Sequence, residues 1–414
     1  MPPRLRRLLD PVLPVGSFDR NARLLVAIMW LAGLIQGFAQ SQAATTLPFT
    51  RAGLGLSEGE MSLLLGFARL AAFGALPLGW FGDHVGRKKP FLWALALILG
   101  GGTIAGLALE GWQFGVAQGI LRIGTTAASG LAIVIIAEQV PADIRAYSIS
   151  FYGAAVSLGA GISLMTLPLA DGSPDAWRIP HLLIGIGVLA LPLLVEKIPE
   201  SELFTRTRHD GHWRELTLGI HARKFWAVGV IGFLVSAFSS VALAFSTGRL
   251  IEGVGLSTGD TVLISLLGGT VGGVGFFIGG HLADAWGRRF TTVMSLTFAL
   301  VGGILLYNTT NLPLIVLAVL LSSFGTFAFV PAGGSHRAEL FPTRLRSSAN
   351  TAAANFAIVG SALGLISGVY TIGRFGLPAT VTTLGVGMVV AALLTLTLPE
   401  TRGQDLSAPV TDRG

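Results

Sequence analysis

Two arginines lie inside long apolar stretches of the sequence, and they are the first candidates for chemistry. Arg122 has polar residues at helical spacing on one side, with Gln118 four residues before it. A guanidinium removed from water needs an anion or several acceptors to offset its desolvation. We therefore interpret this stripe as a cavity face that binds a carboxylate or a hydroxylated solute. A structural arginine that bonds helix-end carbonyls is the alternative. The stripe continues with Thr125, Thr126 and Ser129.

Arg69 has no polar stripe beside it, because Phe67, Leu70 and Phe73 surround it. It lines the same cavity in one interpretation. In the other it is structural and extends its charged head toward water, as long basic side chains do. The sequence leaves both open.

Smaller polar pairs extend the candidate cavity. Gln36 and Gln40 are one helical turn apart, and Ser236 and Ser240 stand 200 residues further on. Asn355 completes the predicted set, and Asn350 could join it. The aromatic residues of these stretches more often face lipid or pack, although one or two could line the path: Trp30, Phe238, Phe324, Phe327 and Phe329.

Composition places these residues in a membrane protein. The chain has 414 residues, of which 52% are hydrophobic and 12% are charged, and its mean hydropathy is +0.70. A spanning helix needs about 20 mostly apolar residues, and apolar segments this long are helices in lipid. We expect an all-α protein with twelve transmembrane helices. The predicted spans are 24–47, 61–81, 90–109, 113–137, 147–169, 179–195, 225–247, 261–280, 290–308, 312–334, 348–372 and 376–398.

The distribution of basic residues predicts the orientation. With both termini in the cytoplasm, 22 of the 28 lysines and arginines fall on the cytoplasmic side, four fall opposite and two lie within spans. Basic residues concentrate in cytoplasmic loops of membrane proteins. The sequence therefore predicts a multi-pass protein of the cell inner membrane. The net charge of +6 reflects this asymmetry, and we expect no nucleic acid as a partner.

The sequence repeats itself at an offset of 200 to 201 residues. The stretch 53–60 (GLGLSEGE) returns at 253–260 (GVGLSTGD), and three further landmarks keep the same register. Two parallel six-helix repeats imply a pseudo-two-fold axis along the membrane normal, with a substrate site between the repeats near the membrane midplane. The predicted parts are a cytoplasmic tail (1–23), a first bundle (24–196), a cytoplasmic linker (197–224), a second bundle (225–398) and a cytoplasmic tail (399–414).

The landmarks resemble the major facilitator superfamily. Residues 79–89 (GWFGDHVGRKK) are similar to its loop between the second and third helices, and residues 280–289 are similar to the second copy of that loop. Residues 199–204 (PESELF) and 399–403 (PETRG) resemble the endings of sugar porters, and Arg122 also fits the sugar-porter and organic-ion branch. The resemblance covers the whole chain and implies alternating access by rocking of the two halves.

The resemblance also implies a network of charged residues that latches the outward-open state. Each ion pair of such a network contributes about 0–1 kcal/mol when exposed, which suits contacts that break in every cycle. In the alternative, these charged residues only fix the membrane topology and the ends of the helices. The predicted latch residues are Asp83, Gly86, Arg87, Glu138, Arg145, Glu200, Asp284, Gly287, Arg288, Glu339, Arg346 and Glu400.

Several family features are absent. Span 24–47 has no acidic residue, span seven has no Gln-Leu-Ser sequence, and span five has no Gly-Pro antiporter pattern. The spans contain two cations, Arg69 and Arg122, and no carboxylate. We therefore predict a cavity with a positive electrostatic potential, which favours an anionic or polyhydroxylated solute. Proton coupling would then need Glu138, Glu339, His181 or the proton of the substrate itself.

We therefore expect a monomeric secondary transporter of a small polar or anionic organic solute, a carboxylate or a sugar-like metabolite. A coupling proton or ion is a further candidate partner. A multidrug exporter of the same fold and an uncoupled sugar facilitator are the alternatives. The sequence has no cysteine, no HExxH, and no Ser-His-acid set or paired aspartates in the spans. We accordingly predict no metal, no cofactor and no enzymatic activity.

Overall fold

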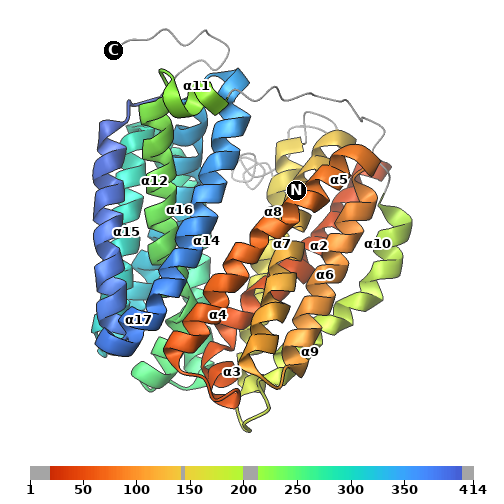
Figure 1. Ribbon diagram of the computed structural model, residues 1–414, viewed down its shortest axis with the longest axis vertical. Helices are drawn as coiled ribbons and strands as arrows, with labels where there is room; N and C mark the ends of the chain where they lie inside the picture. The colour runs from red at the N-terminus through yellow and green to blue at the C-terminus, as the bar shows by residue number, and fades with distance from the viewer. Residues whose placement is uncertain (1–18, 141–144, 199–212, 403–414) are drawn as a thin grey trace, which may run out of the picture. The chain divides into compact units, whose positions relative to one another are not determined.

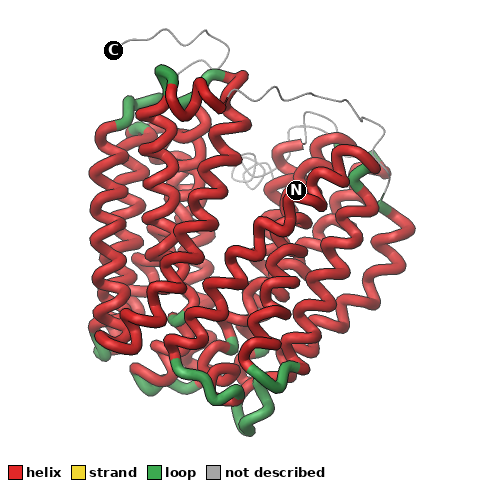
Figure 2. Tube along the Cα trace, viewed as in Figure 1, coloured by secondary structure: helices red, strands yellow, loops and turns green. Residues whose placement is uncertain are grey.

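The computed structural model describes residues 19–140, 145–198 and 213–402. Helices make up nearly all of this part of the chain, and no strand occurs in it (Figure 2). The prediction of an all-α membrane protein is confirmed. By their contacts the helices form two compact units, each described separately below.

Unit 1 comprises Met1–Ala43 and Ala71–Thr207. Its buried core contains side chains from most of its long helices, including Met29, Phe91, Leu121 and Tyr152. The helices of unit 1 (Figure 1) are α2 (Arg20–Thr45), η1 (Ala71–Ala75), α5 (Leu76–Val85), α6 (Lys88–Leu107), α7 (Gly111–Gln139), α8 (Arg145–Met165), η2 (Leu167–Ala170), α9 (Arg178–Leu183), η3 (Ile184–Ala190) and α10 (Leu191–Lys197).

Unit 2 comprises Ala44–Leu70 and Arg208–Gly414. The segment Ala44–Leu70 belongs to the predicted first bundle, yet its contacts are with the second: the Ser62 hydroxyl donates to the carbonyl of Leu365 at 2.6 Å. The helices of unit 2 are α3 (Leu47–Gly53), α4 (Glu58–Leu70), α11 (Trp213–Leu218), α12 (Ala222–Ala244), α13 (Ser246–Gly248), the π-helix η4 (Arg249–Gly253), α14 (Thr258–Trp286), α15 (Arg288–Asn308), α16 (Leu312–Glu339) and α17 (Thr343–Thr397).

Eleven helical segments of the described residues are long and apolar enough to span a membrane. The last covers 46 residues, Ala352–Thr397, about 69 Å at the helical rise of 1.5 Å and more than twice a hydrocarbon core of about 30 Å. Gly376 interrupts it with φ 79° and ψ 164°. The break divides α17 into the predicted spans 348–372 and 376–398, so twelve spans result.

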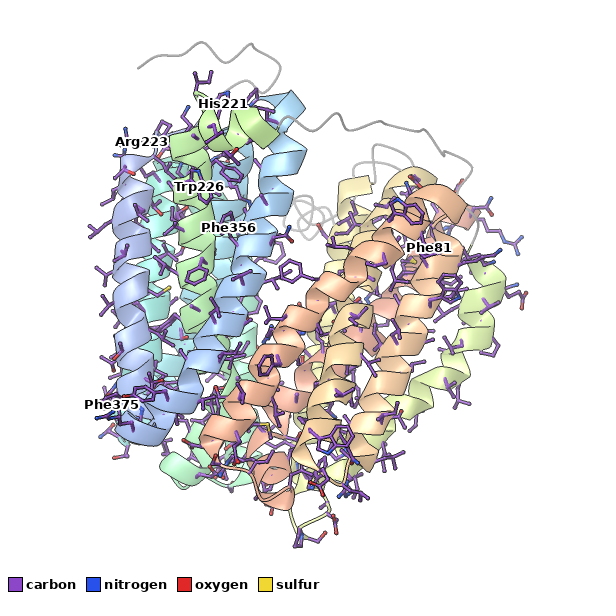
Figure 3. The ribbon with its side chains drawn as sticks, in the orientation of Figure 1. Phe81, His221, Arg223, Trp226, Phe356 and Phe375 are labelled. Atoms are coloured by element: carbon purple, nitrogen blue, oxygen red, sulfur yellow. The ribbon has the colours of Figure 1, made fainter. Side chains whose placement is uncertain are left out.

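Three predicted segments differ in detail. The second span is not one helix, because η1 joins α4 to α5, and η3 likewise divides the sixth span between α9 and α10. The predicted linker 197–224 contains the short helix α11. The indole of Trp226 in α12, close to Phe356 of α17 (Figure 3), donates to the carbonyl of Thr217 in α11 at 3.2 Å.

Glycines place the same helix pair in close contact in both repeats. Gly124 of α7 faces Ala94 of α6, where an added Cβ would lie 2.6 Å from the Ala94 carbonyl oxygen. Gly325 of α16, 201 residues later, faces Ala299 of α15, where a Cβ would lie 2.3 Å from the backbone nitrogen. Small residues allow this approach between membrane helices. The repeat found in the sequence is therefore present in the packing of each unit.

Candidate functional site

Two glycines form the turns of the repeated loops. Gly86 has φ 102° and Gly287 has φ 107°, both with extended ψ values near 160° and 154°. This backbone region is essentially restricted to glycine. Each glycine ends one spanning helix and lets the next begin at once, which places the charged residues of both helix ends together.

In the second loop, Arg288 lies at the centre of an ion cluster. Its guanidinium pairs with Glu339 of α16 at 3.1 Å and also bonds Asp284 of α14. Glu339 in addition accepts a hydrogen bond from the Thr401 hydroxyl at 2.6 Å. The side chains of Arg288 and Glu339 are 13% and 12% exposed, so water screens this pair less than a surface pair.

Glu400 caps the beginning of α15. Its carboxylate accepts from the backbone N–H groups of Arg288 at 2.8 Å and Arg289 at 3.0 Å. Burial raises the pKa of Glu400, but hydrogen bonds from four backbone amides outweigh burial and hold the pKa below its usual value. A negative charge is also favoured at a helix N-terminus. The predicted latch residue therefore joins the chain after α17 to the start of α15.

The first loop shows part of the same arrangement. Arg87 and Glu138, 201 residues before Arg288 and Glu339, pair at 3.5 Å. The described pairs each lie within one unit, so an inter-half latch stays a prediction. Glu200 lies outside the described residues, and the structure describes no side chain for Asp83, Arg145 and Arg346.

Arg69 lies near the middle of the span Glu58–Gly82. Its side chain is half-buried, and it forms no hydrogen bond or ion pair with any residue that the structure describes. Arg122 is half-buried on α7, where its carbonyl accepts from the Thr125 hydroxyl at 3.1 Å. In the candidate spans of the described residues, acidic residues occur within three positions of a span end: Glu58, Glu60, Glu196, Asp260 and Asp284.

Two polar residues predicted to line the cavity are instead engaged inside the bundles. Gln36 is 1% exposed; its amide donates to the Thr125 carbonyl at 3.1 Å and to Ser129, and its oxygen accepts from Tyr152. Ser240 is 6% exposed and donates to the carbonyl of Ser361 at 3.0 Å. In this structure neither side chain offers a free donor to a solute.

Three other residues predicted to line the cavity, all with an amide side chain, keep at least one polar side-chain atom without a hydrogen-bond partner among the described residues. Gln118 is 6% exposed, and its amide nitrogen has no hydrogen-bond partner among the described residues. Gln40 on α2 and Asn355 on α17 are half-buried, with no hydrogen bond to the part of the chain that the structure describes. Ser236 lines a cavity within unit 2. The structure thus assigns different environments to residues that look alike in the sequence.

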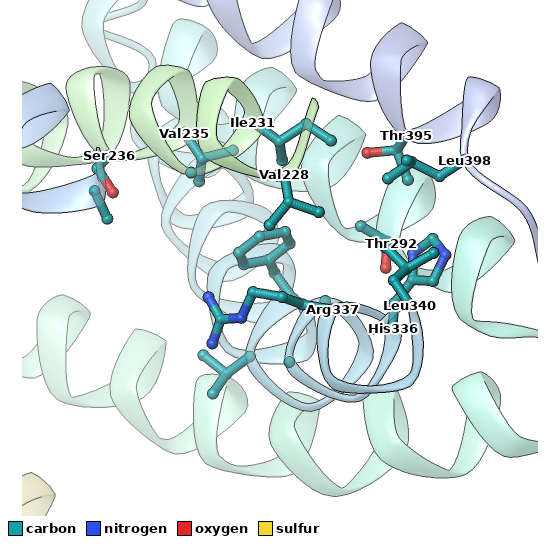
Figure 4. A pocket seen from close by; sticks show the side chains of 16 residues that line it. Val228, Ile231, Val235, Ser236, Thr292, His336, Arg337, Leu340, Thr395 and Leu398 are labelled. Atoms are coloured by element: carbon teal, nitrogen blue, oxygen red, sulfur yellow. The ribbon is translucent and has the colours of Figure 1, made fainter. Parts of the chain in front are cut away.

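The cavity in unit 2 has a volume of about 230 Å³ and lies among α12, α15, α16 and α17 (Figure 4). Its lining is mainly hydrocarbon, with few polar groups. Thr292 is 3% exposed, and its hydroxyl has no partner among the described residues. The apolar lining consists of Val228, Ile231, Val235, Phe329, Val330, Leu340, Ala357 and Leu398.

Arg337 is the arginine that lines this cavity, and it lies beyond the end of the predicted tenth span. The predicted tenth span ended at residue 334, whereas α16 continues to Glu339 and its apolar span to Arg337. The repeat could have corrected this boundary, because the predicted fourth span ends at residue 137, which corresponds to residue 338. The equivalent of Arg337 in the first repeat is Ile136, a fully buried core residue.

Comparison with known proteins follows from this architecture. The sequence profile of the Major Facilitator Superfamily matches residues 29–307 and 272–412. The chain belongs to this superfamily. The chain is similar to the inner membrane metabolite transport protein YhjE of Escherichia coli, 28% identical over 95% of this chain and 97% of YhjE.

A citrate-proton symporter of Salmonella typhi is 29% identical over 55% of this superfamily chain and 58% of its own length. The xylose transporter XylE from E. coli, solved in an inward open conformation, superposes with a TM-score of 0.72 at 18% identity and covers 93% of this chain and 98% of XylE. The similarity to XylE shows the fold alone. The predicted family is confirmed.

Proposed function

We propose that this superfamily protein is a secondary transporter that moves a small organic anion by alternating access. Carboxylates and acidic sugar-like metabolites are the substrate class. Membership of the superfamily supports transport, and the similarity to YhjE and to the citrate-proton symporter supports a metabolite.

The unpaired guanidinium of Arg69 carries the proposal of an anion. It lies near the middle of a span, whereas the acidic residues of the described spans lie at span ends. An ionisable residue inside a membrane marks a functional site by default, because an uncompensated charge there is expensive. Arginine binds a carboxylate through two parallel N–H donors. A solute anion would supply the counter-charge that the described residues do not supply.

Replacement of Arg69 by glutamine should abolish most anion binding. Loss of one charge-assisted hydrogen-bond pair costs about 1.5–3 kcal/mol, a factor of about 10–100 in affinity. The measurement is thermal stabilisation of the purified protein by a panel of carboxylates, sugars and organic cations, since a ligand that binds the folded state raises its apparent stability. We expect wild type to respond to carboxylates and the glutamine variant to lose that response.

Arg374, an exposed arginine of α17 beside Tyr370, is the matched control. Arg374→Gln should keep the carboxylate response. Stabilisation by organic cations but not by carboxylates would contradict the anionic substrate and favour the multidrug alternative.

The basic residues support an inner-membrane protein with both termini in the cytoplasm. The described ends of the loops agree with this distribution: Arg87, Lys88 and Lys89 begin α6, and Arg288 and Arg289 begin α15. In this orientation the ion cluster around Arg288 and the end of α16 at Glu339 lie on the cytoplasmic side. The similarity to an inner membrane protein also supports this location.

Proton coupling is the expected driving force, and a pH gradient should therefore drive uptake. His181 is a poor carrier because it is fully buried between the rings of Phe114 and Trp177. The remaining candidates are Glu138, Glu339 and the carboxyl group of the solute. With one proton per solute, a gradient of one pH unit supports about tenfold accumulation, because about 1.4 kcal/mol corresponds to a factor of ten.

Initial uptake of a labelled carboxylate into proteoliposomes that are alkaline inside is the measurement. Collapse of the gradient with a protonophore should return uptake to the equilibrium level. An uptake rate that is the same with and without the imposed pH gradient would exclude proton coupling and leave facilitated diffusion as the mechanism.

A further inference from the structure

Arg337 is held in place but its charge is not neutralised. Its Nε donates to the Oδ1 of Asn350 at 2.8 Å. No ion pair joins Arg337 to any described acidic residue, although Glu339, two positions further along α16, pairs with Arg288. One hydrogen bond orients the guanidinium and leaves the terminal nitrogens without a partner among the described residues.

Arg337 lines the cavity of unit 2, and its guanidinium lies apart from the neighbouring side chains of His336 and Leu340 (Figure 4). Arginine carries five N–H donors in a planar fork whose geometry matches a carboxylate. A half-buried cation without an anion is costly. Since Asn350 engages Nε alone, the two terminal nitrogens remain free to form bidentate bonds with an entering anion.

The rest of the cavity disfavours a polyhydroxylated solute. Its other polar side chains are Ser236, Thr292, His336 and Thr395, and the last two already bond backbone carbonyls. Val228 and Ile231 of α12 and Phe329 of α16 cover it with hydrocarbon. A sugar would leave most of its hydroxyls without partners there, at a cost of about 1–3 kcal/mol for each group. The volume of about 230 Å³ is below the range of about 300–1,000 Å³ for drug-sized ligands. An apolar body of roughly eight to ten non-hydrogen atoms fits a space equal to about eight waters.

We propose that this cavity is a binding subsite for monocarboxylates with a compact apolar body. The carboxylate binds the terminal nitrogens of Arg337, and the apolar body packs between α12 and α16. The proposal rests on the proposed transport of organic anions and narrows its substrate class, from carboxylates in general to those with an apolar body. Asn350 is a positioning residue that aims the guanidinium.

The test is equilibrium binding of radiolabelled cyclohexanecarboxylate to the purified full-length protein in detergent. Wild type should bind it saturably, and cyclohexylmethanol and gluconate should compete at least tenfold more weakly than unlabelled cyclohexanecarboxylate. Arg337→Gln should weaken binding at least tenfold, and Arg337→Lys should lie between, because lysine keeps the charge but loses the fork. Arg374→Gln should bind as wild type does.

A second variant tests the cavity without touching the charge. A Cβ at Gly334, which lines the cavity, would meet nothing within 4 Å. Gly334→Leu should therefore fold and fill the space, and its binding should fall at least tenfold although Arg337 is intact. Thermal unfolding shows whether each variant is folded. If Arg337→Gln does not fold, Arg337→Lys and Gly334→Leu test the subsite in its place.

The outcomes separate the subsite from the transport function. Binding that is unchanged in both Arg337→Gln and Gly334→Leu overturns the subsite, even where proteoliposomes transport other carboxylates through Arg69. Binding that depends on both residues, combined with no flux of any carboxylate in proteoliposomes, upholds the subsite and overturns the transport proposal. Equal competition by gluconate overturns the apolar substrate class.

Discussion

Replacement of Gly325 by leucine should prevent stable packing of unit 2. A Cβ at this position would lie 2.3 Å from the backbone nitrogen of Ala299 and 2.5 Å from the carbonyl oxygen of Ser295. Backbone atoms of a spanning helix cannot move aside as a flexible side chain can. Overpacking typically costs about 1–3 kcal/mol and occasionally more, and a leucine against backbone belongs to the upper end. Helices α15 and α16 would have to separate along their contact.

Thermal unfolding of the detergent-purified protein measures this effect. Gly273→Leu is the matched control, because Gly273 is an exposed glycine of the neighbouring helix α14 with nothing within 4 Å of an added Cβ. The control should change the free energy of unfolding by about 0.5 kcal/mol or less. Equal loss of stability in the two variants would contradict the close contact between α15 and α16.

Replacement of Arg288 by alanine should cost about 3 kcal/mol of stability and most of the transport rate. The variant leaves Glu339, which is 12% exposed, as a mostly buried carboxylate without its cation, and removal of one partner of a buried pair typically costs about 3–5 kcal/mol. The Thr401 hydroxyl still donates to Glu339 and the cap of α15 by Glu400 remains, so we expect the lower end of this range.

A double-mutant cycle with Glu339→Ala isolates the pair. The double variant should be more stable than Arg288→Ala, because it removes the unpaired carboxylate as well. Additive losses in the two single variants would show that the pair is not coupled. Lys89→Ala, a change at an exposed lysine of the first loop, serves as the control for surface charge.

The repeated loops were predictable because their glycines and charged residues recur at a fixed offset of 201 residues. A glycine with positive φ between two helix ends brings an arginine at its C-terminal side toward an acidic residue of the adjacent helix. The sequence did not say which of these residues pair. The structure pairs Arg87 with Glu138 and, 201 residues later, Arg288 with Glu339.

The candidate cavity was less predictable, because a polar side chain in an apolar span has two uses. It can bond a neighbouring helix or it can face a solute, and its sequence position does not distinguish these. Gln36 bonds across helices in unit 1, while Gln40, one turn away, has no such bond to a described residue. The difference depends on which face of α2 meets α7, which is a property of tertiary packing.

Arg337 was missed for another reason. Hydropathy falls after Gly334, so the predicted span stopped there, although α16 keeps its hydrogen bonds as far as Glu339. A helix can continue through polar residues at a membrane surface because its backbone remains satisfied.

Ile136 and Arg337 occupy equivalent positions of the two repeats but differ in type. This difference bears on how such a chain could have arisen by duplication of one six-helix ancestor. An ancestor that worked as a symmetric dimer would have carried the same residue in both copies. An arginine would then have disrupted the core that Ile136 now fills, and an isoleucine would have left no anion subsite. Only after the ancestral gene was duplicated could each copy change alone. The cavity at Arg337 is therefore expected to be a later acquisition than the repeated loops.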